Sequence, residues 1–349
     1  MNKQKICIMG HYGEGKNLLN GQTIKTKIIT EGLIKALGED EVSIIDTHGG
    51  AKALPRCFLQ LGLSFIKCKN IIMLPAHNGV RIFTPIMLFW NALFHRRLHY
   101  VVIGGWLPDY LKDKPRLAKQ LKKFDGIYVE TSTMKKAMED QGFKNLHILP
   151  NCKDLHILSE EELICSNQES YKFCTFSRVL KEKGIEDAIL AVKMVNEDAG
   201  YTKATLDIYG QIDLGYEEEF NQIMSFVSEY IYYGGLVPFD ESTDVLKSYT
   251  ALLFPTYYAG EGFAGTLIDA MASGTLVIAS DWKYNPELVT EGVTGFLYPT
   301  RNVERLTDKI KYVMDNPKTV MNMKRNCIRE ARNYLPENAM RILVEKIED

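Results

Sequence analysis

Short apolar runs alternate with helix-like segments along the first half of the chain. Residues 23–37 carry apolar side chains at helical spacing, and Gly38 just beyond them predicts a helix C-cap. The apolar runs predict strands at KICIMG (5–10), EVSIID (41–46), NIIMLP (70–75), HYVVIGG (99–105), GIYVET (126–131) and NLHILPN (145–151). Strands that alternate with helices predict a parallel sheet covered on both faces.

A second alternating set begins near residue 172, after a polar and acidic stretch over 155–171. Its predicted strands are KFCTFS (172–177), TLDIYG (205–210), IYYGG (231–235), ALLFPT (251–256) and TLVIAS (275–280). We therefore expect an α/β protein with two Rossmann-like, doubly wound parallel-sheet domains that face each other across a cleft. The predicted boundaries are 1–155, 156–325, and a C-terminal helix over 326–349 that packs back on the first domain. Ligands of such sheets bind beyond the carboxyl ends of the strands.

Composition restricts the class of protein. A chain of 349 residues favours two domains, and its 46% hydrophobic and 25% charged residues are ordinary for a soluble globular protein. No apolar run approaches the roughly 20 residues that span a bilayer, and the N-terminus shows no signal-peptide pattern. The seven cysteines form no C-x-x-C pair, which favours reduced thiols in a cytoplasmic protein over a disulfide framework or a zinc site.

The net charge of −2 hides an asymmetry between the two halves. Residues 1–155 contain 23 Lys and Arg against 13 Asp and Glu, whereas residues 156–349 contain 19 against 31. A basic half joined to an acidic half indicates that the first half meets an anionic molecule, although the difference also fits chance. Nucleic acid is poorly supported, because the basic residues follow no recognisable binding module.

The segment PTYYAGEGFAGTLIDAMASGTLVIASD (255–281) carries the most chemistry. It follows a predicted strand with a glycine-rich loop, and a helix is expected to begin near Ala264. The free N–H groups of such a helix start form a site for phosphate. Glu261 stands in the loop, and Asp269 lies over the helix start on one face.

The run EGFAGTLIDAMASG (261–274) resembles the signature E-x-F-G-x-x-x-x-E-A-M-A-x-G of retaining glycosyltransferases of the GT-B fold. These are the E-x7-E enzymes of glycosyl transferase group 1, or family 4, of the bacterial polysaccharide type. Asp269 replaces the usual second Glu, and Ala264 replaces a Gly. The spacing of the two carboxylates is unchanged, but the reach of the second one is altered.

Further segments support the resemblance in family order and cover residues 125–315 well, and the first 120 weakly. FSRVLKEKGIEDAILA (176–191) resembles the donor-phosphate segment, with Arg178 and Lys183 in matching places. TLDIYG, YYGGLVPFDE (232–241) and LKSYTALLFPT (246–256) resemble the segments that follow it. NPELVTEGVTGFLYP (285–299) matches P-E-x-x-x-x-G-x-x-G-x-L, and ILPNCKD (148–154) resembles I-P-N-G-V-D.

The resemblance implies the donor-side roles. Glu261, Arg178 and Lys183 are the predicted catalytic residues: Glu261 holds the sugar hydroxyls of the donor, and the two cations stabilise the departing β-phosphate. The other predicted donor-binding residues are Gly262, Phe263, Ala264, Gly265, Thr266, Leu267 and Asp269. Their N–H groups at 265–267 assist the phosphate, and Asp269 holds the ribose. No D-x-D motif follows a strand, so we expect a metal-independent hexosyltransferase with no cofactor and, by default, a UDP-sugar donor.

The acceptor side is the first domain. The predicted acceptor loop comprises Gly13, Gly15, Lys16 and Gly21, with His77 and His11 at neighbouring strand ends. The acceptor is expected to be a saccharide or a polyprenyl-linked saccharide of cell-surface polysaccharide or capsule synthesis. The basic, apolar segments 52–69 and 85–100 either line the core or contact an anionic membrane. The expected location is the cytoplasm, with peripheral contact at the inner face of the membrane.

Three other functions fit parts of the sequence. Gly10, Gly15 and Lys16 have P-loop spacing, but Asn17 stands where an NTPase needs Ser or Thr for magnesium. A sugar-nucleotide epimerase or phosphorylase would keep the fold and change the reaction. A binding protein without catalysis would keep the donor site alone.

Overall fold

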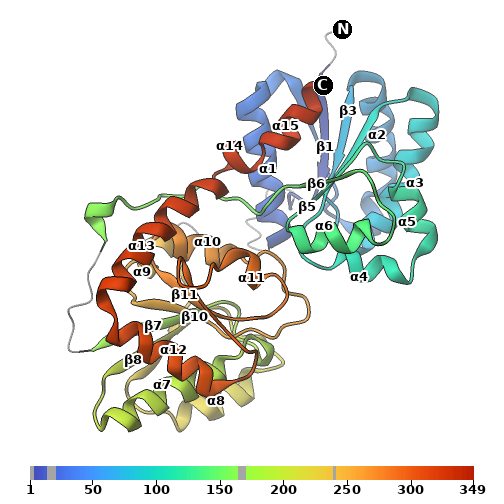
Figure 1. Cartoon of the computed structure of the whole chain (residues 1–349). Coiled ribbons are helices and arrows are strands. Elements are labelled where there is room, and N and C mark those ends of the chain that lie inside the picture. The colour runs from blue at the N-terminus through green and yellow to red at the C-terminus, as the bar shows by residue number, and fades with distance from the viewer. Residues whose placement is uncertain (1–3, 14–20, 164–169, 239–240) are drawn as a thin grey trace. The chain divides into compact units, whose positions relative to one another are not determined.

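The computed structural model describes residues 4–13, 21–163, 170–238 and 241–349 (Figure 1). The chain forms two compact units. The first comprises Met1–Asp154 together with Tyr334–Asp349, and the second comprises Leu155–Asn333. The chain therefore returns to the first unit at Tyr334. The sequence had predicted that this C-terminal segment begins at residue 326.

The first unit contains a six-stranded sheet in which every paired neighbour is parallel, in the order β2-β1-β3-β4-β5-β6. Its strands are β1 Ile6–Gly10, β2 Val42–Asp46, β3 Asn70–Met73, β4 Arg97–Val101, β5 Gly126–Val129 and β6 Leu146–Ile148. The order reverses between β1 and β3, which pair Ile6 with Asn70. Each of the six strands predicted for the first half is present.

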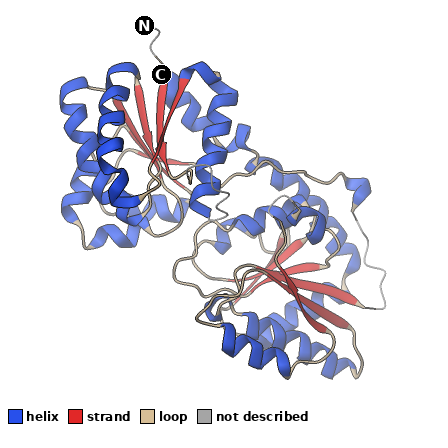
Figure 2. Cartoon of the chain, turned by 180° about the vertical axis from the view of Figure 1, so that it is seen from behind, coloured by secondary structure: helices blue, strands red, loops and turns tan. Residues whose placement is uncertain are grey.

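Helices cover both faces of this sheet (Figure 2). They are α1 Gly21–Leu37, α2 Leu54–Lys67, α3 His77–Phe94, α4 Leu107–Lys112, α5 Pro115–Leu121, α6 Ser132–Glu139, α14 Pro336–Ala339 and α15 Arg341–Glu348, with 3-10 turns η1 Glu39–Glu41 and η2 Gly50–Ala53. Within the predicted apolar segment 85–100, α3 ends at Phe94 and β4 begins at Arg97. The left-handed residue His95 (φ 51°) separates them and caps the helix.

The returning C-terminal segment completes the core of the first unit. Leu343 and Ile347 of α15 are buried in one cluster with Ile29 and Leu33 of α1 and with Ile8 of β1. A Cβ built on Gly32 would lie 2.7 Å from the sulfur of Met340, so this glycine lets α1 approach the end of α14 closely. Each fully buried aliphatic side chain of this kind contributes about 1.5–3 kcal/mol to folding.

A buried ion pair lies among the same strands. The Lys25 ammonium of α1 donates to the Glu130 carboxylate, which follows β5, and both side chains are almost completely buried. Lys25 also donates to the carbonyl oxygen of Val102, 3.4 Å away. A buried charge is tolerated only with a partner, so each of these two side chains depends on the other.

The second unit repeats the architecture with the order β12-β11-β10-β7-β8-β9, again with parallel neighbours. Its strands are β7 Tyr171–Phe176, β8 Ala204–Tyr209, β9 Ile231–Gly235, β10 Ala251–Phe254, β11 Leu276–Ser280 and β12 Gly295–Tyr298. The sequence predicted five of the six and missed β12. This edge strand has four residues and begins at Gly295, so it lacks the β-branched run that marks its neighbours.

The helices of the second unit are α7 Ile185–Ala199, α8 Glu217–Ser225, α9 Ser242–Leu246, α10 Gly265–Ala272, α11 Asn285–Leu288, α12 Val303–Asp315 and α13 Pro317–Ala331, with 3-10 turns η3 Glu160–Glu162 and η4 Lys181–Lys183. A further 3-10 turn, η5 Arg332–Tyr334, spans the boundary with the first unit. The strand order reverses between β7 and β10, which pair Phe173 with Ala251. The loops that follow these two strands therefore lie side by side at the carboxyl edge of the sheet, where doubly wound folds bind ligands.

Candidate donor site in the second unit

The predicted catalytic residues Lys183 and Glu261 meet at this reversal point. The Lys183 Nζ lies 2.6 Å from the Glu261 Oε2, and both side chains are about nine-tenths buried. Lys183 ends the turn η4 after β7, and Glu261 stands in the loop after β10. The ammonium also lies 5.3 Å from the ring centre of Tyr258, within the range of a cation–π contact.

Backbone contacts hold the two loops together. The Tyr257 N–H donates to the carbonyl oxygen of Glu182 at 2.8 Å. Gly184, which follows Lys183, has φ +70°, and a Cβ there would lie 2.2 Å from the carbonyl oxygen of Pro255. Only glycine combines this backbone conformation with this close approach. Gly184 thus holds the backbone of the preceding residue, Lys183, close to the loop after β10.

Glu261 is oriented by its own loop. The Thr256 hydroxyl donates to the Glu261 Oε2 at 2.7 Å, and the Glu261 N–H donates to the carbonyl oxygen of Tyr258 at 3.1 Å. The indole N–H of Trp282 donates to the same Tyr258 carbonyl oxygen at 2.7 Å. One carboxylate oxygen thus accepts from both an ammonium and a hydroxyl, and these two hydrogen bonds fix the orientation of the Glu261 side chain.

The helix α10 begins directly after this loop. Ala264 is its extended N-cap residue and provides no side-chain cap, so polar N–H groups of the first turn are open to a ligand. The Thr266 hydroxyl is buried and has no hydrogen-bond partner among the described residues. The Leu267 N–H donates to the carbonyl oxygen of Ala264 at 3.1 Å, so of the three predicted N–H donors only those of Gly265 and Thr266 fit a phosphate site.

The remaining donor-side residues lie around the same loop. Phe263 is buried, Gly262 is half-buried, and Asp269 is buried in the second turn of α10. Arg178 follows β7, and its side chain is half exposed, with Nη1 3.8 Å from the Asp213 Oδ2. The structure thus pairs Lys183 with Glu261 and pairs Arg178 with a carboxylate from the loop after β8.

On the first unit, His77 lies in an aromatic cluster. Its ring stacks on Trp106 with centroids 3.8 Å apart, and Tyr110 meets both rings edge-on. The Tyr110 hydroxyl donates to the His77 carbonyl oxygen at 3.1 Å, and the Lys114 ammonium lies 3.8 Å above the Tyr110 ring. Partial burial and then the charge of Lys114 lower the pKa of His77. The ring therefore favours its neutral form.

The predicted first loop is described in part. Gly13 adopts φ +88°, and Gly21 is the first residue of α1, whereas Gly15 and Lys16 lie outside the described residues. His11 after β1 accepts or donates a hydrogen bond with Thr23 (2.9 Å) and with His48 (3.1 Å). Of the P-loop spacing over residues 10–17, Gly10 is described, whereas Gly15, Lys16 and Asn17 lie outside the described residues.

No group of three or more His, Cys, Asp or Glu side chains suited to a metal ion occurs in residues 4–13, 21–163, 170–238 and 241–349. Metal independence stays a prediction. Six of the seven cysteines lie in these described residues, and all six are unpaired and buried.

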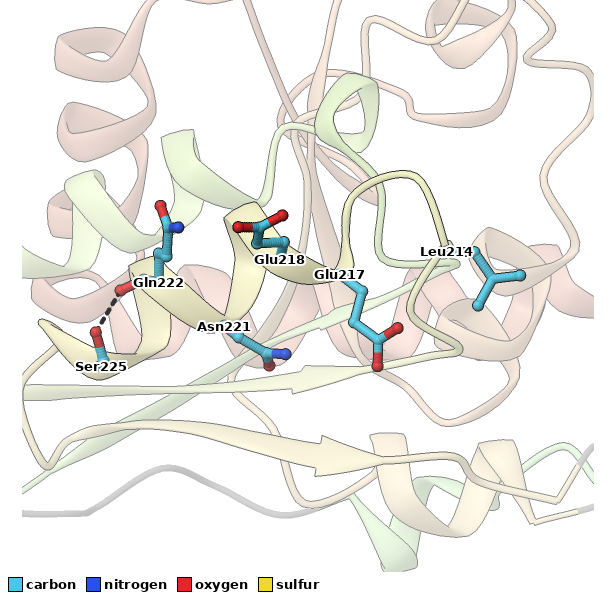
Figure 3. A pocket seen from close by; sticks show the side chains of 6 residues that line it. All are labelled: Leu214, Glu217, Glu218, Asn221, Gln222 and Ser225. Atoms are coloured by element: carbon cyan, nitrogen blue, oxygen red, sulfur yellow. Dashed lines mark hydrogen bonds between the residues drawn. The ribbon is translucent and has the colours of Figure 1, made fainter.

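A separate hollow beside α8 is lined by Leu214, Glu217, Glu218, Asn221, Gln222 and Ser225 (Figure 3). Its two carboxylates disfavour a phosphate ligand.

Comparison with known proteins identifies the second unit. Residues 162–334 match the model of the family described as glycosyl transferases group 1. The chain belongs to this family through its second unit. An uncharacterized glycosyltransferase of Methanocaldococcus jannaschii is 26% identical over 174 residues, which cover 48% of this chain and 41% of that protein. The GtfA subunit of the UDP-N-acetylglucosamine–peptide N-acetylglucosaminyltransferase of Streptococcus pneumoniae is 27% identical over 194 residues, 54% of this chain and 37% of that protein.

The whole chain resembles solved glycosyltransferases in fold. The crystal structure of Anabaena HepE in complex with UDP has a TM-score of 0.75 at 13% identity and covers 99% of this chain and 100% of that one. A sucrose-phosphate synthase of Thermosynechococcus elongatus has a TM-score of 0.73 at 15% identity, with 99% and 98% covered. These similarities establish the GT-B fold, with two Rossmann-like domains. The chain spans less than half the length of each of these two curated relatives.

Sequence reasoning missed two contributors to the donor site. Thr256 and Tyr258 contact the Glu261–Lys183 pair, yet the sequence marked them only as the end of a predicted strand and the start of the loop after it. The signal was available, because PTYY follows a buried strand directly at the carboxyl edge of the sheet. Trp106 and Tyr110 were likewise missed beside His77, because they come from a different loop and helix.

Proposed function

We propose that this chain is a glycosyltransferase that moves a sugar from a nucleotide-sugar donor to a saccharide or lipid-linked saccharide acceptor. The carrying observation is the buried Lys183–Glu261 pair at the strand-order reversal, next to the uncapped start of α10. It unites a cation, a carboxylate and helix N–H groups in one place. A nucleotide sugar needs these three groups, for its phosphates, its hydroxyls and its leaving charge.

The chemistry follows from charge. Cleavage of the donor's glycosidic bond leaves negative charge on the β-phosphate and positive charge on the sugar. Fixed positive groups aimed at the phosphate stabilise that transition state more than the ground state. We assign this role to Lys183 and Arg178, with the N–H groups of Gly265 and Thr266. Glu261 then exchanges Lys183 for a sugar hydroxyl when the donor binds, and Asp269 holds the ribose.

We further propose retention of the anomeric configuration and independence of metal. Two cations and a helix start supply the positive charge that a divalent ion would otherwise provide. UDP is the first nucleotide to test, because the HepE complex contains UDP and the GtfA name specifies UDP-N-acetylglucosamine. No nucleophile is assigned, so the departing phosphate is the candidate for accepting the acceptor's proton.

The acceptor is proposed to bind the first unit at the His77–Trp106–Tyr110 cluster. Aromatic faces bind the apolar faces of sugar rings, and Lys114 adds positive charge for an acceptor with a phosphate. Cell-surface polysaccharide or capsule synthesis in the cytoplasm, at the inner membrane face, is the setting that fits such an acceptor. No helix of the described residues combines the length and apolarity needed to cross a bilayer.

A thermal-shift screen against nucleotide sugars tests the donor. A ligand at a hundredfold excess over its Kd stabilises the folded chain by about 2.7 kcal/mol. We expect one UDP-sugar to raise the Tm. NMR of the transfer product should show the same anomeric configuration as the donor. The transfer rate should be unchanged by EDTA. Epimerised or phosphorolysed donor instead of transfer would support the epimerase or phosphorylase, and donor binding without any product would support a silent binder.

A further inference from the structure

The helices α2 and α3 of the first unit expose a broad apolar surface. On α2, Leu59, Leu63 and Ile66 are each more than half exposed, and their spacing of four and three residues places them on one stripe. On α3, Ile82, Phe89 and Leu93 lie on a second stripe, with Phe89 56% and Leu93 62% exposed. Together these six side chains define what we call the apolar face.

The two stripes adjoin each other. The ring of Phe58 on α2 lies 6.2 Å from that of Phe89 and 5.2 Å from that of Trp90 on α3. A Cβ on Gly62 would lie 2.7 Å from the Trp90 ring, so this glycine lets the helices approach closely. The helices are therefore packed side by side, and their exposed stripes form one continuous surface. A contiguous apolar surface of this kind marks an interaction site.

The chain segment that carries the apolar face has charges of one sign. Between Asp46 and Asp109 the sequence contains no Asp or Glu, and it contains seven basic residues: Lys52, Arg56, Lys67, Lys69, Arg81, Arg96 and Arg97. By helical spacing, Arg56 and Lys67 flank the stripe of α2, and Arg81 flanks that of α3. Both Lys67 and Arg81 are exposed. Two such faces repel each other, which disfavours a second copy of the chain as the occupant.

We propose that the apolar face docks on an anionic lipid bilayer, with α2 and α3 lying in the membrane interface. Leu, Ile and Phe side chains enter the acyl boundary, while the flanking cations contact lipid phosphates. The helix α3 starts at His77, so the docked surface ends at the aromatic cluster assigned to the acceptor. The inference rests on the proposed function only in linking this face to a lipid-linked acceptor, because docking itself needs no donor.

Vesicle flotation tests the proposal. The unmodified chain should float with vesicles of equal parts phosphatidylglycerol and phosphatidylcholine at low salt, and less with added salt or with phosphatidylcholine alone. A Leu63→Glu/Phe89→Glu double variant should bind at least about tenfold more weakly, since each change removes an apolar side chain worth a large share of the affinity.

A matched control uses exposed apolar residues of the second unit. Leu190 on α7 and Phe226 after α8 are 48% and 90% exposed, so a Leu190→Glu/Phe226→Glu variant should float like the unmodified chain. Absence of flotation at low salt, or equal flotation of both double variants, would overturn the proposal. A dimer in light scattering that dissociates only in the Leu63→Glu/Phe89→Glu variant would also overturn it.

Transfer to a soluble acceptor separates this proposal from the proposed function. If docking is right, the Leu63→Glu/Phe89→Glu variant loses flotation and keeps donor binding by calorimetry. If the transferase assignment fails while flotation behaves as expected, the membrane surface stands without it.

Discussion

The Lys183 ammonium and the Glu261 carboxylate, 78 residues apart in the chain, are separated by 2.6 Å between Nζ and Oε2. The cation proposed for the donor phosphate is therefore held by the carboxylate proposed for the donor sugar. Such a pair keeps both buried side chains compensated while the site is empty. When the donor binds, the Lys183–Glu261 contact is replaced by a contact of Lys183 with the phosphate and a contact of Glu261 with a sugar hydroxyl. Neither charge is left without a polar partner.

Glu261 is expected to be essential for turnover. Glu261→Ala removes the carboxylate and leaves Lys183 buried without its partner, and Glu261→Gln keeps a hydrogen-bond acceptor but loses the charge. We expect both to lower kcat, by about 10²–10³-fold or more for the alanine variant, in a transfer assay with the true donor.

Glu219→Gln provides the matched control, since Glu219 also lies 2.6 Å from a lysine, Lys181, but on the solvent-exposed surface. Its kcat should be unchanged. Near-normal turnover of Glu261→Ala would contradict the site assignment.

Gly184→Ala is expected to destabilise the second unit. The residue has φ +70°, and a Cβ would lie 2.2 Å from the Pro255 carbonyl oxygen, so the loops after β7 and β10 must separate. We expect a loss of about 2–4 kcal/mol in the free energy of unfolding. Denaturant titrations that monitor the fluorescence of Trp282 measure this loss.

Gly200 at the other end of α7 serves as a control that separates the clash with Pro255 from the cost of the backbone conformation. It has a similar φ of +74°, and no atom lies within 4 Å of a Cβ built there. Gly200→Ala should cost only about 1 kcal/mol, the conformational penalty alone. Equal losses for the two variants would show that the contact with Pro255 is unimportant.

The buried Lys25–Glu130 pair should matter for the stability of the first unit. Lys25→Met leaves the Glu130 carboxylate buried without its ammonium, and we expect a loss of about 3–5 kcal/mol. Fluorescence of Trp90 and Trp106 during urea unfolding measures it. The exposed pair Lys181–Glu219 serves as control, and Lys181→Met should leave the unfolding midpoint unchanged. A midpoint unchanged in Lys25→Met as well would contradict the prediction.

His99 should make the first unit sensitive to mild acid. It is buried between Asn70 and Tyr128, and burial lowers its pKa to about 4. The unfolded chain binds this proton below about pH 6.5, but the folded chain does not until about pH 4. Stability is therefore lost as the pH falls through this window, by up to about 3 kcal/mol. The loss from this group ends below pH 4.

His99→Gln keeps a polar side chain and removes the titration. The free energy of unfolding should fall less steeply in the variant than in the unmodified chain between pH 6.5 and 4.5, in urea titrations at matched ionic strength. Parallel curves would show that His99 takes up its proton equally in both states.

The strands were largely predictable because each buried parallel strand is a short apolar run. The loop and the helix start around Glu261 were predictable because glycines directly after a buried strand allow a tight turn into a helix. The Lys183–Glu261 contact was not, since it depends on β7 lying beside β10, and strand order is decided by packing of the whole sheet. The Trp106–His77 stack escaped notice for the same reason, because it joins the first residue of α3 to the segment after β4.

The return of the chain at Tyr334 has a consequence for biosynthesis. Leu343 and Ile347 leave the ribosome after every residue of the second unit, yet they fill the core of the first. Apolar side chains of α1 and β1 in the first unit therefore lack these partners while the second unit is translated and folds. Domains usually complete themselves in order of synthesis. Here the synthesis of the first unit starts before that of the second, but its core is completed afterwards. During that interval its exposed apolar side chains are available to chaperones and to aggregation.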